Sequence, residues 1–144
     1  MIFWGTNKRV KVDYKVISQL ENLQNLFLDI KDFDTKINST FKELSVGVSK
    51  LKHLKNILID LKNNKISAKN WSNLELFLGS TSSLEKLGIG FSHNEGKEFA
   101  IKGFESSQNI KELNLVIQGN NFDYSNTFEK ILTLKNLEIL SIDI

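Results

Sequence analysis

Apolar residues recur at one spacing in five separate segments of this chain. Each segment opens with leucines or isoleucines three positions apart and then alternates between apolar and other residues. The segments span residues 20–30, 51–61, 84–91, 110–117 and 134–144. Because alternation with a period of two is typical of a strand buried on one face, we expect one strand in each segment.

Stretches with the apolar spacing of a helix separate these expected strands. Their apolar positions are Phe41, Leu44, Val48 and Leu51, then Trp71, Leu74, Phe77 and Leu78, then Phe99, Ala100 and Phe104, and finally Phe128, Ile131 and Leu132. One strand and one helix form a unit that recurs every 26 to 31 residues. Self-similarity at this period predicts a repeat array in which neighbouring units stack.

An asparagine follows three of the strands at one fixed offset. Asn64, Asn94 and Asn120 each lie seven positions after an apolar anchor residue of their own unit. An asparagine amide can bond backbone groups where the chain turns out of a sheet. Stacked units would therefore place these three side chains in a structural ladder.

The strand and asparagine pattern is shared with a known repeat family. It reads Leu54-x-x-Ile57-x-Ile59 with Asn64 and Ile66, Leu84-x-x-Leu87-x-Ile89 with Asn94, and Ile110-x-x-Leu113-x-Leu115 with Asn120 and Phe122. Over about residues 20–144 the chain resembles the leucine-rich repeat family, in its intracellular, ribonuclease-inhibitor-like style. The resemblance implies an α/β fold, a short solenoid or horseshoe segment with parallel strands on the concave face and helices on the convex face.

The chain departs from the common family pattern in three ways. The asparagine comes two residues later than usual, which adds a buried position to each strand: Ile30, Leu61, Phe91, Ile117 and Ile144. Phe33 stands where the first unit would carry its asparagine, and Gly96 replaces an apolar residue. The resemblance to the family survives these changes, but the chain does not fit one exact subclass of the family.

The sequence predicts two regions, residues 1–19 and residues 20–144. In residues 1–19, Val10, Val12, Tyr14 and Val16 alternate with polar residues, which predicts a strand capping the N-terminal edge of the array. Residues 20–144 form about five units, of which the last ends before its asparagine. We therefore expect more chain or a neighbouring molecule to cover the C-terminal sheet edge, as in a fragment or an edge-pairing subunit.

The strand residues that alternate with the buried ones must point to the opposite face. In the resembled family this concave face binds partners. The candidate binding residues are Asn25, Phe27, Asp29, Asn56, Leu58, Asp60, Lys86, Glu112, Asn114 and Val116. Phe27 and Leu58 would place apolar side chains side by side on this face, which favours a protein contact unless the N-terminal cap or a long loop covers them.

Asp29 and Asp60 share one position in neighbouring strands, so their carboxylates would lie about 5–7 Å apart. A basic group on a partner would relieve their repulsion. The alternative is a catalytic acid and base, because close carboxylates separate in pKa. No nucleophile or histidine joins this position, so we favour two solvated carboxylates and a chain that is not an enzyme.

Composition excludes several other classes of function. The chain has no cysteine, and its two histidines, His53 and His93, lie in different units, so we expect neither a metal site nor a cofactor. A net charge of +2 is too small for a nucleic-acid partner. The glycines of Gly88-x-Gly90 lie within a strand and lack the rest of a phosphate-binding loop, so they favour close approach of another molecule.

No apolar stretch reaches the roughly 18 residues that span a membrane, and the first four residues are too short a run for a signal peptide. We therefore expect an intracellular, cytoplasmic protein that binds no membrane. The favoured function is a non-catalytic protein-interaction module or assembly subunit. The alternatives are a regulatory repeat domain of an enzyme, such as a GTPase activator or a kinase-associated segment, and a structural subunit of a large complex.

Overall fold

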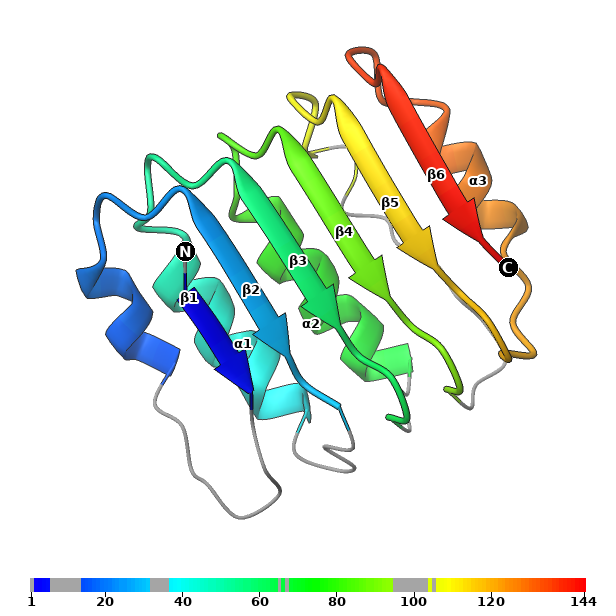
Figure 1. Cartoon of the computed structure of the whole chain (residues 1–144), viewed down its shortest axis with the longest axis horizontal. Helices are drawn as coiled ribbons and strands as arrows, with labels where there is room; N and C mark the ends of the chain where they lie inside the picture. The colour runs from blue at the N-terminus through cyan, green and yellow to red at the C-terminus, as the bar shows by residue number, and fades with distance from the viewer. Residues whose placement is uncertain are drawn as a thin grey trace.

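The computed structural model describes residues 2–5, 14–31, 37–64, 66, 68–94, 104 and 106–144. Strands and helices alternate along most of this length (Figure 1). The elements are β1 (Ile2–Gly5), the 3₁₀ helix η1 (Tyr14–Gln19), β2 (Asn25–Asp29), α1 (Ile37–Val48), β3 (Asn56–Asp60), α2 (Ala68–Gly79), β4 (Lys86–Gly90), β5 (Glu112–Val116), α3 (Ser125–Ile131) and β6 (Ile139–Asp143). The expected order of strand and helix is confirmed except between β4 and β5, where most of the expected helix lies outside the described residues.

All the strands pair in parallel and in sequence order, so each unit adds one strand beside the previous one. The anchor residues Leu26, Ile57, Leu87, Leu113 and Leu140 lie directly opposite one another across the sheet. The helices α1, α2 and α3 lie on one side of this sheet (Figure 1). The α/β repeat solenoid predicted from the sequence is therefore the observed fold. We call the face of the sheet opposite the helices the open face.

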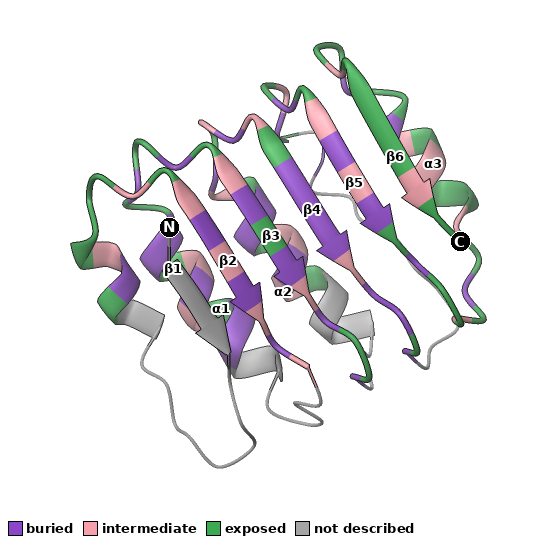
Figure 2. Ribbon diagram, in the orientation of Figure 1, coloured by how far each residue is buried: buried purple, intermediate pink, exposed green. Residues whose placement is uncertain are grey.

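The core lies between the sheet and the helices, where the inner side chains of β2 to β5 are buried (Figure 2). Phe41 of α1 and Phe77 of α2 are fully buried there, and their ring centroids are 6.5 Å apart. Leu132, by contrast, was expected on the buried side of the last helix and is 85% exposed, because it follows the buried Ile131 by about 100° around the helix axis.

The extra inner position after each strand is buried in four units, at Ile30, Leu61, Phe91 and Ile117. The backbone N–H of each of these residues bonds to the next strand, as in the 2.7 Å bond from Phe91 to the Val116 carbonyl. Pairing therefore continues one residue beyond each strand. The prediction was wrong at Ile144, which is 82% exposed because it has a neighbouring strand on one side only.

The N-terminal region differs in part from its prediction. A strand does pair with β2, but it is β1 at Ile2–Gly5, with Phe3 opposite Phe27. Residues Tyr14–Gln19, where alternation favoured a strand, form η1 instead. A 3₁₀ helix repeats every three residues, so Ile17 lies in the core whereas Val16, an apolar residue of the expected alternation, is 45% exposed.

Several residues named from the sequence lie outside the described part of the chain. These are Val10, Val12, Phe33, Gly96, Phe99 and Ala100. Of the apolar positions expected in the third helix, the structure describes Phe104, which is fully buried.

The turns after β3, β4 and β5 each contain a left-handed residue that sequence reasoning missed. Asn63, His93 and Gly119 have φ values of 58°, 57° and 67°, and each immediately precedes a ladder asparagine. Asparagine, glycine and, less often, histidine are the residues that accept this conformation. The left-handed residue turns the chain so that the following asparagine points back beneath the sheet.

We expect Gly119→Ala to lower the free energy of unfolding by about 1–2 kcal/mol, because alanine is strained at positive φ. A Cβ at Gly119 would also lie 2.6 Å from His93 Nδ1, so the imidazole ring must move. Urea denaturation measures the loss. Gly79→Ala is the control, since its Cβ would meet Ser106 Oγ at an ordinary 3.7 Å; equal losses in both variants would contradict the strain argument.

Candidate binding face

The outward side chains of the strands form three rows across the open face. The first row is Asn25, Asn56, Lys86, Glu112 and Ile139; the middle row is Phe27, Leu58, Gly88, Asn114 and Ser141; the last row is Asp29, Asp60, Gly90, Val116 and Asp143. Parallel pairing without a register shift produces these rows, because equivalent residues of successive units lie opposite one another. Every binding residue expected from the sequence lies in one of them.

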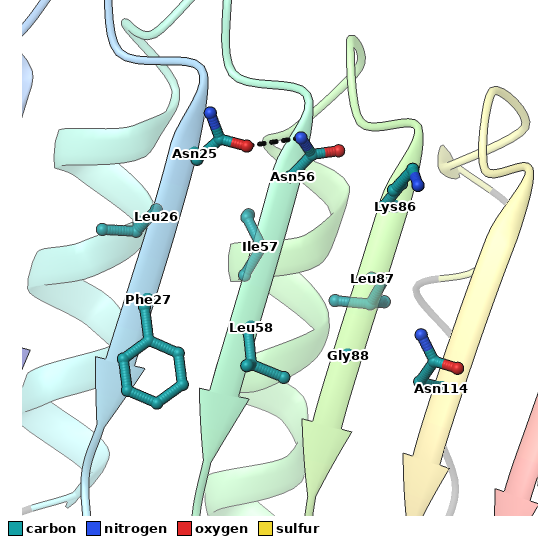
Figure 3. A pocket seen from close by; sticks show the side chains of 10 residues that line it. All are labelled: Asn25, Leu26, Phe27, Asn56, Ile57, Leu58, Lys86, Leu87, Gly88 and Asn114. Carbon is teal, nitrogen blue, oxygen red and sulfur yellow. Dashed lines mark hydrogen bonds between the residues drawn. The ribbon is translucent and has the colours of Figure 1, made fainter. Parts of the chain in front are cut away.

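An open hollow of about 470 Å³ lies over the first and middle rows (Figure 3). Its lining residues are Asn25, Leu26, Phe27, Asn56, Ile57, Leu58, Lys86, Leu87, Gly88 and Asn114. Leu58 is 46% exposed, and no described cap or loop covers it. The apolar pair expected from the sequence thus belongs to a concavity of the open face.

Gly88 shapes the hollow by lacking a side chain. Leu58 extends toward β4 (Figure 3), and a Cβ at Gly88 would lie only 2.5 Å from Leu58 Cδ1. Gly88 is therefore buried beneath Leu58, although its side of the strand faces outward. The floor of the hollow consists of the Leu58 side chain, which is apolar, and the Gly88 backbone, which is paired in the sheet.

The first row supplies a polar rim whose members bond one another. Asn56 donates from its amide Nδ2 to Asn25 Oδ1. Lys86 Nζ lies 2.7 Å from Glu112 Oε2, and Asn114 Nδ2 donates to Glu112 Oε1 at 3.1 Å. These bonds hold the side chains around the hollow in defined positions.

The ion pair shifts the pKa values of both Lys86 and Glu112. The Lys86 ammonium, helped by the Asn114 amide, holds the pKa of the Glu112 carboxyl below its ordinary value. Glu112 in turn raises the pKa of Lys86. Both effects come from hydrogen bonds and charge attraction that favour the ionised forms.

A pH dependence follows from the lowered pKa of Glu112. Its contribution to stability is present above the ordinary glutamate pKa, near 4.3, and is lost as the pH falls through the lower folded value. We expect Glu112→Gln to lower the melting temperature by about 1–2 °C at neutral pH, with the difference closing as the pH falls below the ordinary glutamate pKa. Thermal scans at several pH values measure this; a difference that persists at the lowest pH would contradict it.

The last row contains an ion-pair cluster that includes a residue missed from the sequence. Lys31 Nζ lies 3.4 Å from Asp29 Oδ2 and 3.0 Å from Asp60 Oδ2. The hydrogen bond and attraction from Asp60 raise the pKa of Lys31. The basic group expected from a partner is thus supplied by the chain itself. Lys31 follows Asp29 by two residues, so the period of two points it to the same face.

The three ladder asparagines lie at the far ends of the strands, beneath the sheet. Asn64 Nδ2 donates to the carbonyls of Ile30 and Leu61, at 2.7 and 2.8 Å. The Asn64 backbone N–H donates to Asn94 Oδ1 at 2.9 Å, and that of Asn94 donates to Asn120 Oδ1 at 2.6 Å. Each asparagine therefore joins its own turn to a neighbouring unit, which is a structural role.

Other functional groups remain apart within the described residues. No group of three or more histidine, aspartate or glutamate residues there is arranged to hold a metal ion. His53 and His93 lie in the turns of different units and do not border the hollow. Among the described helices, none combines the length and apolar character that crossing a membrane requires.

No protein-family model and no curated protein sequence matches the chain. Among solved structures, the tropomodulin C-terminal domain from Caenorhabditis elegans aligns with a TM-score of 0.51 at 13% identity, over 92% of this chain and 84% of that one. A structure of TLR13 in complex with ssRNA13 aligns with a TM-score of 0.43 at 18% identity, over 88% of this chain and 20% of that one. The tropomodulin alignment agrees with a solenoid of the leucine-rich repeat type.

Proposed function

We propose that this chain is a non-catalytic module that binds a protein partner on its open face. The observation that carries the proposal is the apolar hollow at Phe27, Leu58 and Gly88, beside the polar side chains of Asn25, Asn56, Lys86 and Asn114. An apolar concavity with a polar rim has the anatomy of a protein-binding hot spot, in which one buried anchor contributes most of the affinity.

The repeat architecture supports the same function. Stacked units create an extended, preformed surface, so little conformational entropy is lost when a partner binds. The rim bonds between Asn25 and Asn56, and between Lys86 and Glu112, fix side chains that would otherwise have to be ordered on binding. A rigid hollow of this kind can bind a shaped side chain without rearrangement.

The double variant Phe27→Ala, Leu58→Ala tests the proposal. We expect partner capture in a pull-down followed by mass spectrometry to fall at least tenfold, since anchor residues each contribute about 2 kcal/mol or more. Thermal melting checks that the variant stays folded, since Leu58 is 46% exposed whereas Phe27 is only partly exposed. Capture that is unchanged would remove these residues from the proposal.

Two exposed apolar residues on the helix side provide a matched control. Val46 of α1 and Leu76 of α2 are 49% and 64% exposed, and neither lines the hollow. The double variant Val46→Ala, Leu76→Ala removes a similar apolar area and should leave capture unchanged. Equal losses in the two double variants would point to non-specific adhesion, and turnover by the purified chain would contradict the non-catalytic part of the proposal.

A further inference from the structure

Asn56 places a hydrogen-bond acceptor at the edge of the hollow, which it lines. Its Nδ2 donates to Asn25 Oδ1, so its own amide oxygen points the other way, toward Lys86 on the neighbouring strand (Figure 3). Among the described residues, none donates a hydrogen bond to Asn56 Oδ1. Because the bond to Asn25 fixes the amide, this oxygen stays directed over the hollow when another molecule enters.

The acceptor restricts what can fill the hollow. A molecule that enters displaces water from the rim, and an acceptor that is then left without a partner lowers the affinity. Aliphatic side chains and phenylalanine carry no donor for Asn56 Oδ1. A lysine or arginine carries donors, but its charge would lose water to the apolar walls at Phe27 and Leu58. The best occupant is therefore an apolar side chain with a neutral donor.

The size and walls of the hollow favour an aromatic occupant. A closed cavity of about 150 Å³ among leucine, isoleucine and phenylalanine side chains holds one benzene molecule. This open hollow measures about 470 Å³, which leaves room for a side chain of two fused rings. Phe27 provides a ring on one side (Figure 3), and a second aromatic ring packs favourably against it, offset or edge to face.

Resting on the proposed function, we propose that the partner inserts a tryptophan side chain into the hollow. Its indole ring packs on Phe27 and Leu58, and its Nε1–H donates to Asn56 Oδ1. Tryptophan joins a large apolar surface to one donor and has no acceptor, which matches a single acceptor beside apolar walls. It is also among the side chains most enriched in the hot spots of protein interfaces.

A displayed library of short random peptides, selected on the immobilised chain and then remade synthetically, tests this inference. We expect the enriched peptides to share a tryptophan. Replacing it with benzothienylalanine, which has a sulfur atom in place of the ring N–H, should weaken binding about three- to tenfold, the range of one neutral hydrogen bond. The same replacement should have no effect on binding to the Asn56→Ala variant, because that variant has already lost the acceptor.

Asn114→Ala is the matched control. Asn114 also lines the hollow, but its Nδ2 donates to Glu112 and its oxygen points away from Gly88 (Figure 3). In this variant benzothienylalanine should weaken binding as much as in the parent chain. Peptides that need Phe27 and Leu58 but lack tryptophan, or that bind equally well with benzothienylalanine, would overturn this inference and leave the proposed function standing. A selection without binders, or with binders indifferent to Phe27→Ala, Leu58→Ala, would contradict both.

Discussion

Asn94→Ala is expected to lower the free energy of unfolding by about 2–4 kcal/mol, because the variant leaves several buried backbone groups unsatisfied. Asn94 is 4% exposed and lies in the middle of the ladder. Its Nδ2 donates to the carbonyls of Leu61 and Phe91, and its Oδ1 accepts the Asn64 backbone N–H. Alanine removes all three bonds.

Equilibrium denaturation in urea measures this loss, and Asn109→Ala provides the matched control. Asn109 also joins two units, through a 2.7 Å bond from its Nδ2 to the Ser82 carbonyl, but it is exposed. Water can replace that bond, so we expect a loss below about 1 kcal/mol. Similar losses at Asn94 and Asn109 would show that burial does not determine how much the ladder asparagines contribute to the free energy of unfolding.

The sequence predicted the sheet register and the assignment of strand residues to faces. Both follow from covalent geometry, since successive side chains of a strand point to opposite sides whatever their neighbours are. The anchors Leu26, Ile57, Leu87 and Leu113 repeat often enough to fix the pairing without knowledge of side-chain positions. The same regularity located the asparagines whose bonds now define the ladder.

Features that depend on side-chain conformation or on turns were not predictable in this way. The hollow depends on Leu58 extending over Gly88, and the ion-pair cluster depends on Lys31 reaching two strands. The alternation that ends at Val16 favoured a strand, whereas the observed 3₁₀ helix buries Ile17 and leaves Val16 exposed. This helix packs against α1, a contact that the local pattern does not reveal.

Phe91→Ala is expected to lower the free energy of unfolding by about 3–5 kcal/mol, through lost burial and the cavity that remains. Phe91 is fully buried at the extra inner position after β4, and its backbone N–H is fixed by the bond to the Val116 carbonyl. The fixed backbone limits how far neighbouring residues can move into the space. Urea denaturation measures the loss, and the slope of the free energy of unfolding against urea concentration should stay unchanged.

Two further variants separate cavity formation from the mere loss of an apolar side chain. Phe91→Leu restores the residue type of the equivalent position, Leu61, and should cost about 1–1.5 kcal/mol. Leu76→Ala removes a 64% exposed side chain of α2 and should stay within about 0.5 kcal/mol of the parent chain. If Phe91→Ala cost no more than Leu76→Ala, the residue added after each strand would lie outside the core, and the two-residue delay of the asparagine would have no packing role.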